Sequence, residues 1–139
     1  MKKFICSIAI AAIVLQACNT KNDYEAVFSN PLLYSNITNQ LTEVITYDIF
    51  TPPVASRIYA YGHLAAYEVM VHGNTKYSTL DGQIKDWENV PSPPTGAPIQ
   101  YQFAATLALT QIGEALTFSK ETTAAIIDSL HQLAKNHGM

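Results

Sequence analysis

The sequence predicts an all-α fold with about four helices in the mature chain. Three observations favour this fold class. Apolar residues recur at helical spacing in four stretches, turn-forming residues separate those stretches, and no stretch gives a convincing strand. The roughly 120 residues that follow the predicted leader amount to one domain of usual size. We therefore expect a partial helical bundle.

Start and stop signals give the bounds of these helices. Thr51 is a suitable N-cap for the second helix, and Pro52 and Pro53 fit its first turn, where a missing N–H costs nothing. Ser35 or Asn36 is expected to cap the first helix in the same way. The predicted helices cover residues 37–50, 53–71, 98–118 and 120–136.

The apolar positions predict which face of each helix is buried. The first helix has one stripe, made of Ile37, Leu41, Val44, Ile45 and Ile49. The second carries apolar residues on more than one face, as a helix buried among other helices does. The third, opened by Pro98, is expected to bury Tyr101, Ala104, Ala105, Ala108, Ile112, Ala115 and Leu116. The fourth, capped by Ser119, has a stripe of Ala124, Ile127, Leu130 and Ala134, with Ile126 and Leu133 beside it.

A long connection without helical periodicity separates the second and third helices, from Gly73 to Pro98. It is rich in proline, glycine and serine, which are turn-forming residues. Trp87 is the only tryptophan in the chain and is expected to hold this connection against the helices. A loop of this length within a compact domain is usually functional or a surface excursion.

The N-terminus predicts a bacterial lipoprotein signal peptide over residues 1–18. Lys2 and Lys3 form a charged start, a short apolar run follows, and Ala17 precedes Cys18. That order resembles a lipobox, whose cysteine is lipidated and becomes the first residue of the mature chain. An ordinary secretory signal with a chance cysteine is the alternative. We expect a lipid-anchored protein of the bacterial cell envelope, periplasmic or associated with the outer membrane.

A tether and lead-in segment over 19–36 is expected to join the anchor to a helical domain over 37–139, which we expect to be incomplete. The full chain has a formal net charge of −3, and without Lys2 and Lys3 six basic residues stand against 11 acidic ones, a charge of −5. Nucleic-acid binding requires a basic face, so we expect no nucleic-acid partner. The membrane, reached through the lipid anchor, is the expected partner.

Two residue pairs, Glu68–His72 and Asp128–His131, place a carboxylate and an imidazole on one face of a helix. A two-metal bundle site uses two Glu-x-x-His motifs with further glutamates, and neither pair matches that motif. Interhelical or surface hydrogen bonding is therefore favoured over a metal site. His63 is expected to be a hydrogen-bonded core histidine rather than a base. The chain has no zinc, phosphate-loop or nucleophile-elbow motif.

Arg57 is the only arginine in the chain. A structural ion pair or a contact with a helix C-terminus is the favoured interpretation. The alternative is anion recognition, since a guanidinium binds phosphate or carboxylate through two parallel hydrogen bonds. Nothing near Arg57 in the sequence supplies the further donors that a phosphate site requires.

The stretch from Tyr47 to Tyr61, with Ala65-Ala66-Tyr67-Glu68, resembles the N-terminal helical region of bacterial lipoproteins in the type 2 phosphatidic acid phosphatase / vanadium-dependent haloperoxidase superfamily. The likeness is specific in Pro-Pro-Val-Ala-Ser-Arg-Ile-Tyr-Ala-Tyr over 52–61 and extends over roughly 41–137. It implies a partial helical bundle like the N-terminal part of the haloperoxidase-like fold.

Members of that superfamily hydrolyse phosphate esters, or oxidise halides on a histidine-held vanadate. Their chemistry uses a lysine followed by Arg-Pro, then Pro-Ser-Gly-His, then Ser-Arg with a later histidine and aspartate. Here Pro93 follows Pro91-Ser92, and no histidine–aspartate pair follows Ser56-Arg57 at the required place. No catalytic, cofactor-binding or metal-ligating residue therefore carries over. We expect no cofactor in this chain, and vanadate only in a full-length relative of the haloperoxidase type.

Two explanations fit this departure from the superfamily pattern. In the favoured one, the chain is the N-terminal scaffold portion of a longer lipid-anchored phosphatase- or haloperoxidase-like protein, its partner is a missing C-terminal catalytic half, and this chain alone is inactive. In the alternative, it is a stand-alone helical envelope lipoprotein that binds a ligand or partner. The first explanation predicts exposed apolar surface on the helices.

Overall fold

The computed structural model describes residues 22–87, 90–96 and 98–139. The regular secondary structure of these residues is entirely helical, which confirms the all-α prediction. The helices are α2 (Tyr24–Phe28), α3 (Pro31–Tyr47), α4 (Pro52–Val71), α5 (Tyr101–Leu116) and α6 (Lys120–Asn136). None of these described helices combines the length and the apolar character that crossing a bilayer requires.

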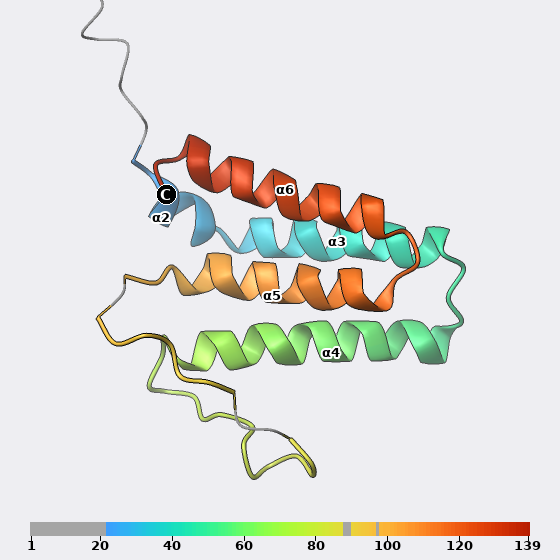
Figure 1. Cartoon of the computed structure of the whole chain (residues 1–139), viewed down its shortest axis with the longest axis horizontal. Helices are drawn as coiled ribbons and strands as arrows, with labels where there is room; N and C mark the ends of the chain where they lie inside the picture. Colours follow the sequence, from blue (N-terminus) through green and yellow to red (C-terminus); the bar gives the residue numbers. More distant parts are fainter. Residues whose placement is uncertain (1–21, 88–89, 97) are drawn as a thin grey trace, which may run out of the picture.

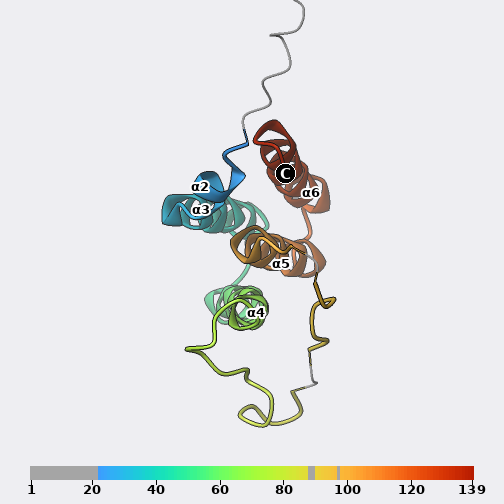
Figure 2. The ribbon, with the colours of Figure 1, turned by 90° about the vertical axis from the view of Figure 1, so that its left-hand side faces the viewer.

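Helix α5 lies at the centre of the bundle. It packs most extensively on α4, and it also contacts α6 and α3. Figure 2 shows α3 and α6 on one side of α5 and α4 on the other. Consecutive long helices run antiparallel, α3 with α4 and α5 with α6 (Figure 1). The connection between α4 and α5 loops out beyond α4, away from the other helices (Figure 2).

The core is built from one fully buried leucine on each of three helices. These are Leu41 on α3, Leu109 on α5 and Leu130 on α6. Two glycines allow the neighbouring helices to approach these leucines. A Cβ atom on Gly62 of α4 would lie 2.8 Å from Cδ1 of Leu109, and one on Gly113 of α5 would lie 2.7 Å from Cδ1 of Leu41. Real atoms do not pack that closely, so both helix contacts depend on the missing side chain.

Helix α3 begins at Pro31, earlier than predicted. The side chain of Asn30 accepts a hydrogen bond from the Leu32 backbone N–H at 3.0 Å, and proline occupies the first helical position. The prediction that Ser35 or Asn36 caps this helix is therefore wrong. An Asn-Pro pair indicates a turn, but it is equally a cap followed by the residue best suited to a first turn.

Helices α4 and α6 have nearly the predicted bounds, because sharp start signals precede both. Thr51 and Ser119 do occupy the cap positions, although neither uses its side chain as the cap. The buried stripe of α6 includes Leu130 and Ala134, as predicted, and continues through Ile126 rather than Ala124 and Ile127, which are only partly covered. The stripe of α3 is also confirmed, except for Ile49, which lies beyond the helix and is 86% exposed.

Helix α5 lies within the predicted range but is shorter at both ends, and its predicted buried face is largely wrong. The helix begins at Tyr101, where the side chain of Gln100 accepts a hydrogen bond from the Phe103 N–H at 2.7 Å. Its buried residues are Phe103, Ala105, Thr106, Leu109, Thr110 and Gly113, of which only Ala105 was predicted. A central helix contacts neighbours on several sides, so apolar spacing does not single out one face. The Thr106 and Thr110 hydroxyls bond to backbone carbonyls one turn earlier, which lets both side chains be buried.

Asp48, directly after α3, joins the two helix connections at one end of the bundle. Its carboxylate accepts hydrogen bonds from the backbone N–H groups of Phe118, at 2.7 Å, and Ser119, at 3.1 Å, and from the Ser119 hydroxyl. An aspartate from another part of the chain therefore caps the N-terminus of α6. Partial burial raises the pKa of Asp48, but these hydrogen bonds outweigh it, so the pKa lies below its ordinary value of 3.8.

Asp48 is expected to make stability depend on pH in acid. A carboxylate with a lowered pKa in the folded state stabilises that state above its unfolded pKa, near 3.8, and this contribution is lost as the pH falls through the folded pKa. The difference in urea midpoint between the wild type and Asp48→Asn should therefore be largest near neutral pH and shrink below pH 3.8. A difference that stays constant into acid would contradict this role, and Asp128→Asn is the control for loss of an exposed carboxylate.

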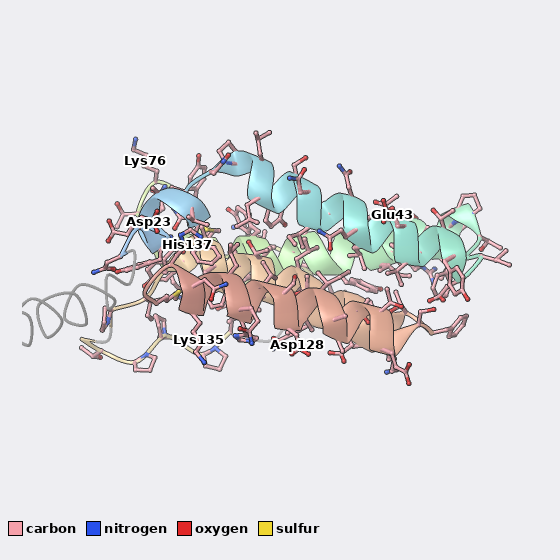
Figure 3. The ribbon with its side chains drawn as sticks, turned by 90° about the horizontal axis from the view of Figure 1, so that it is seen from above. Asp23, Glu43, Lys76, Asp128, Lys135 and His137 are labelled. Atoms are coloured by element: carbon pink, nitrogen blue, oxygen red, sulfur yellow. The ribbon has the colours of Figure 1, made fainter. Side chains whose placement is uncertain are left out.

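At the other end, the start of α2 lies against the end of α6 (Figure 3). The backbone N–H groups of Asp23 and Tyr24 both donate to the carbonyl of His137 at 3.2 Å. The His137 ring also contacts the Asp23 carboxylate through Nδ1, at 2.5 Å. These contacts fix residues 23–28 onto the bundle, in a stretch that was predicted to be tether and lead-in.

Candidate functional site

Tyr34 on α3 and His63 on α4 form a part-buried polar pair that links the two helices beside a cavity. The Tyr34 hydroxyl lies 2.8 Å from Nδ1 of His63, and the two rings are 5.8 Å apart. Burial raises the pKa of Tyr34, so its hydroxyl stays protonated and can donate to a neutral imidazole. This contact confirms that His63 is hydrogen-bonded, although its side chain is only partly buried. That His63 is not a base stays a prediction.

A cavity of about 390 Å³ lies beside the Tyr34–His63 pair. Its walls come from α2, α3, α4 and α5, and they are mostly apolar. The residues lining it include Phe28, Pro31, Ala66, Tyr67, Met70 and Ala105. An apolar hollow with a few polar groups has the composition of a small-molecule site. Sequence reasoning missed it, because nothing in the sequence indicates that residues 34 and 63 meet.

Glu68, predicted as half of a carboxylate–histidine pair, instead holds the α4–α5 connection. Its side chain is 1% exposed, and its carboxylate accepts hydrogen bonds from the Leu80 backbone N–H at 2.6 Å and from the Thr79 hydroxyl at 2.7 Å. His72, one turn later, is exposed at the end of the helix. Glu68 is thus hydrogen-bonded, but the bonds are neither at the surface nor between helices as predicted, because both partners belong to the connection.

The second predicted pair, Asp128 and His131, lies exposed on α6. Figure 3 shows Asp128 on the outer side of that helix. The His131 ring contacts the edge of Phe103, with ring centres 5.8 Å apart. Among the described residues, no three His, Cys, Asp or Glu side chains are grouped so that they could hold a metal ion.

Arg57 lies exposed on α4, and its guanidinium forms no ion pair with the rest of the described chain. The predicted structural ion pair is therefore not found among these residues. Val54 and Tyr61 occupy the same stripe of α4, since residues three and four apart share a helix face. They are 41% and 52% exposed, so the stripe combines one cation with two apolar side chains.

Trp87 lies in the α4–α5 connection and is partly buried. Its backbone N–H donates to the carbonyl of Ile84 at 3.2 Å, which closes a turn within the connection. The indole Nε1 is buried without a hydrogen-bond partner among the described residues. That Trp87 holds the connection against the helices stays a prediction.

Vanadate is an oxyanion, so a vanadate site requires several cationic or N–H donors that converge on one point together with a histidine. Arg57 and His63 are six residues apart on α4, which places them about 120° apart around the helix. Their side chains do not converge, and Nδ1 of His63 is bonded to Tyr34. The described residues therefore do not fit a vanadate site.

The all-α bundle, with the sequence block over 52–61 on α4, has the architecture that the resemblance to the haloperoxidase-like fold implies. A solved structure described as the first bacterial vanadium-dependent iodoperoxidase is similar to this chain, with 36% identity and a TM-score of 0.71. The match covers 75% of this chain and 25% of the iodoperoxidase chain. The predicted resemblance to the phosphatase and haloperoxidase superfamily is therefore confirmed. Comparisons with family models and with curated proteins found no match.

The predicted signal peptide over 1–18 and the predicted lipidation site at Cys18 lie outside the described residues. So does the first part of the predicted tether, up to residue 21.

Proposed function

We propose that this chain is the N-terminal scaffold portion of a lipid-anchored protein like the phosphatidic acid phosphatases and vanadium haloperoxidases. One observation carries the proposal: a chain that spans a quarter of an iodoperoxidase matches it at 36% identity with a TM-score of 0.71. The described residues contain no catalytic constellation of that superfamily. Phosphate-ester hydrolysis or halide oxidation therefore belongs, in this proposal, to the whole protein and not to this chain alone.

The outer stripe of α4 supports this scaffold role. Glu68 lies on the same stripe as Val54, Arg57 and Tyr61, seven residues beyond Tyr61. The α4–α5 connection covers the stripe at Glu68, where the carboxylate binds Leu80. Nothing in the described chain covers the earlier part of the stripe. A cation flanked by two apolar side chains suits burial against further helices of a larger protein, where Arg57 would find an acidic partner.

The size and activity of the native protein test this proposal. An antibody raised against the described helices is expected to detect a native product longer than 139 residues. The purified native product should oxidise iodide with vanadate or hydrolyse a phosphate ester, and the 139-residue chain should do neither. A native product of this length without turnover would contradict the scaffold role. Turnover that copurifies with this chain alone would contradict it as well.

Cys18→Ser is expected to abolish lipid attachment. The wild-type protein should incorporate labelled fatty acid and fractionate with membranes, because a covalently attached acyl chain can anchor a protein to the bilayer. The variant should lose the label and leave the membrane fraction after processing at another site, or remain uncleaved. Cys6→Ser is the matched control, since Cys6 lies inside the predicted signal peptide and should not change labelling. Equal labelling of wild type and Cys18→Ser would rule out this anchor.

A stand-alone ligand-binding lipoprotein is the second candidate function. The cavity beside Tyr34 and His63 favours it, because about 390 Å³ of apolar space with one polar pair is enough for a small neutral aromatic molecule. Saturable binding of 1-naphthol, lost in Met70→Trp, together with a native product of this length, would favour this function over the scaffold role.

A further inference from the structure

A groove of about 750 Å³ runs between the C-terminal half of α3 and the N-terminal half of α6. The core residues Val44 and Ile126 line its floor, and they are almost fully buried. Tyr47 and Phe118 line its end and are 79% and 75% exposed. The groove therefore has an apolar floor and two exposed aromatic side chains at one end, on a different part of the bundle from the cavity beside His63.

The aromatic end of the groove is held rigidly. Asp48 binds the backbone of Phe118 and Ser119, which ties the α3–α4 turn to the α5–α6 turn. The ring of Phe118 also packs on Phe50, with ring centres 4.8 Å apart. The Phe118 ring is thus positioned before a partner binds, and Tyr47 presents its exposed side chain from the last turn of α3.

Ile49, next to this end, directly follows the C-cap of α3 and has a left-handed conformation, with a φ of 56°. Its N–H donates to the Thr46 carbonyl at 3.1 Å, and the Phe50 N–H donates to the Ile45 carbonyl at 3.3 Å, so Ile49 occupies the left-handed position of a Schellman motif that ends the helix. That position is unfavourable for a β-branched residue, and the Ile49 side chain is 86% exposed there. Ile49, Tyr47 and Phe118 together form a cluster of exposed large apolar side chains, which marks an interaction surface.

The charges along the groove indicate the kind of partner. Glu43 on α3 and Glu121 on α6 line opposite walls, and Lys120 is the only cation among the lining residues. Figure 3 shows α3 and α6 side by side, with Glu43 labelled on α3. The walls are therefore acidic on balance and favour a basic partner over an anionic lipid surface.

We propose that this groove binds an amphipathic helical segment of another protein, with apolar anchors on one face and basic residues beside them. The α3 wall extends from Gln40 to Tyr47, which is about two helical turns and matches anchors spaced i, i+3 or i+4, and i+7. The anchors cover Val44, Ile126 and the two aromatic side chains, and the basic residues face Glu43 and Glu121. This interaction is separate from the scaffold role and does not depend on it.

A pair of synthetic peptides tests the proposal on the full chain. One is an amphipathic helix of leucine and lysine, and the other has glutamate in place of each lysine. Fluorescence anisotropy is expected to show that the basic peptide binds at least about tenfold more tightly than the acidic one. The double variant Tyr47→Ser/Phe118→Ser should weaken binding of the basic peptide at least about tenfold. The variant Glu43→Lys should reduce the preference for lysine over glutamate.

Two further variants keep the outcome interpretable. Leu32→Ser removes an equally exposed apolar side chain at the other end of α3, and it should leave binding unchanged. Ile49→Gly should raise the thermal unfolding midpoint, because glycine tolerates the left-handed conformation, and should still weaken peptide binding. Circular dichroism establishes that each variant is folded.

Several results would overturn the proposal. They are equal binding of both peptides, wild-type affinity in the double variant, and loss of binding in Leu32→Ser. Self-association of the wild type that disappears in Tyr47→Ser/Phe118→Ser would assign the groove to a second copy of this chain instead. Binding to phosphatidylglycerol vesicles that disappears in the same variant, without peptide binding, would assign it to a membrane surface.

Discussion

Leu109→Ala is expected to lower the free energy of unfolding by about 3–5 kcal/mol, the range for truncating a fully buried leucine that leaves a cavity. Leu109 has no exposed surface and lies on the central helix, between α4 and the α3–α6 side of the bundle. A loss of that size is a large part of the total stability of a domain, which is about 5–15 kcal/mol. Urea denaturation followed by circular dichroism measures it.

Leu116→Ala is the matched control on the same helix. Leu116 is 38% exposed, so its truncation should cost less than about 1 kcal/mol. Equal losses in the two variants would mean that α5 is not the centre of the core.

Gly62 gives a second test of the packing around Leu109, because the two residues are in close contact. In the wild type, the methyl group of Gly62→Ala would meet Cδ1 of Leu109 at 2.8 Å, and overpacking offsets the gain in helix propensity of about 1 kcal/mol. In the Leu109→Ala background, that methyl group has room, so Gly62→Ala should stabilise the protein. A double-mutant cycle compares the two effects, and an identical effect in both backgrounds would refute the close contact of α4 and α5.

Glu68→Ala is expected to free the α4–α5 connection without unfolding the bundle. The substitution removes the carboxylate that accepts from Leu80 and Thr79, and hydrogen bonds to a charged group contribute about 1.5–3 kcal/mol. Local opening of the connection should become easier by about 2–3 kcal/mol, so the Leu80 amide should exchange with solvent about 100-fold faster. Limited proteolysis should cut the connection, while the helical signal stays unchanged.

Two controls define this effect. Glu68→Gln keeps an acceptor oxygen and should show a smaller increase in exchange at Leu80. Glu43→Ala removes an exposed glutamate from α3 and should leave exchange in the connection unchanged. If Glu68→Ala instead unfolds the helices together with the connection, Glu68 stabilises the whole bundle and does not act on the connection alone.

The sequence was sufficient to predict the helices whose ends carry strong local signals. Thr51 with two prolines begins α4, and Ser119 before a charged turn begins α6, so the bounds of both helices followed from neighbouring residues. The superfamily resemblance followed from the block over 52–61, which is specific enough to be recognised without a structure.

The face of α5 and the contacts of the candidate site did not follow from the sequence. A helix with neighbours on several sides has no single apolar stripe, and its threonines are buried by bonding to their own backbone. The pairs Tyr34–His63 and Asp48–Ser119 join residues far apart in the chain, and a local pattern contains no information on such distances. The sequence pairs Glu68 only with His72, because Thr79 and Leu80, its partners in the structure, lie in a stretch without helical periodicity.

The central position of α5 has a consequence for how the chain folds. Helices α3 and α4 follow one another, yet each packs mainly on other helices. In the described chain, two side-chain hydrogen bonds join them, Tyr59 to Thr42 and Tyr34 to His63. A hairpin with so little shared surface gains little by forming alone. The stable nucleus has to wait until α5 docks on α4, which requires closing the loop over residues 72–100. During synthesis, the first two long helices therefore remain open to chaperones and proteases until α5 has left the ribosome.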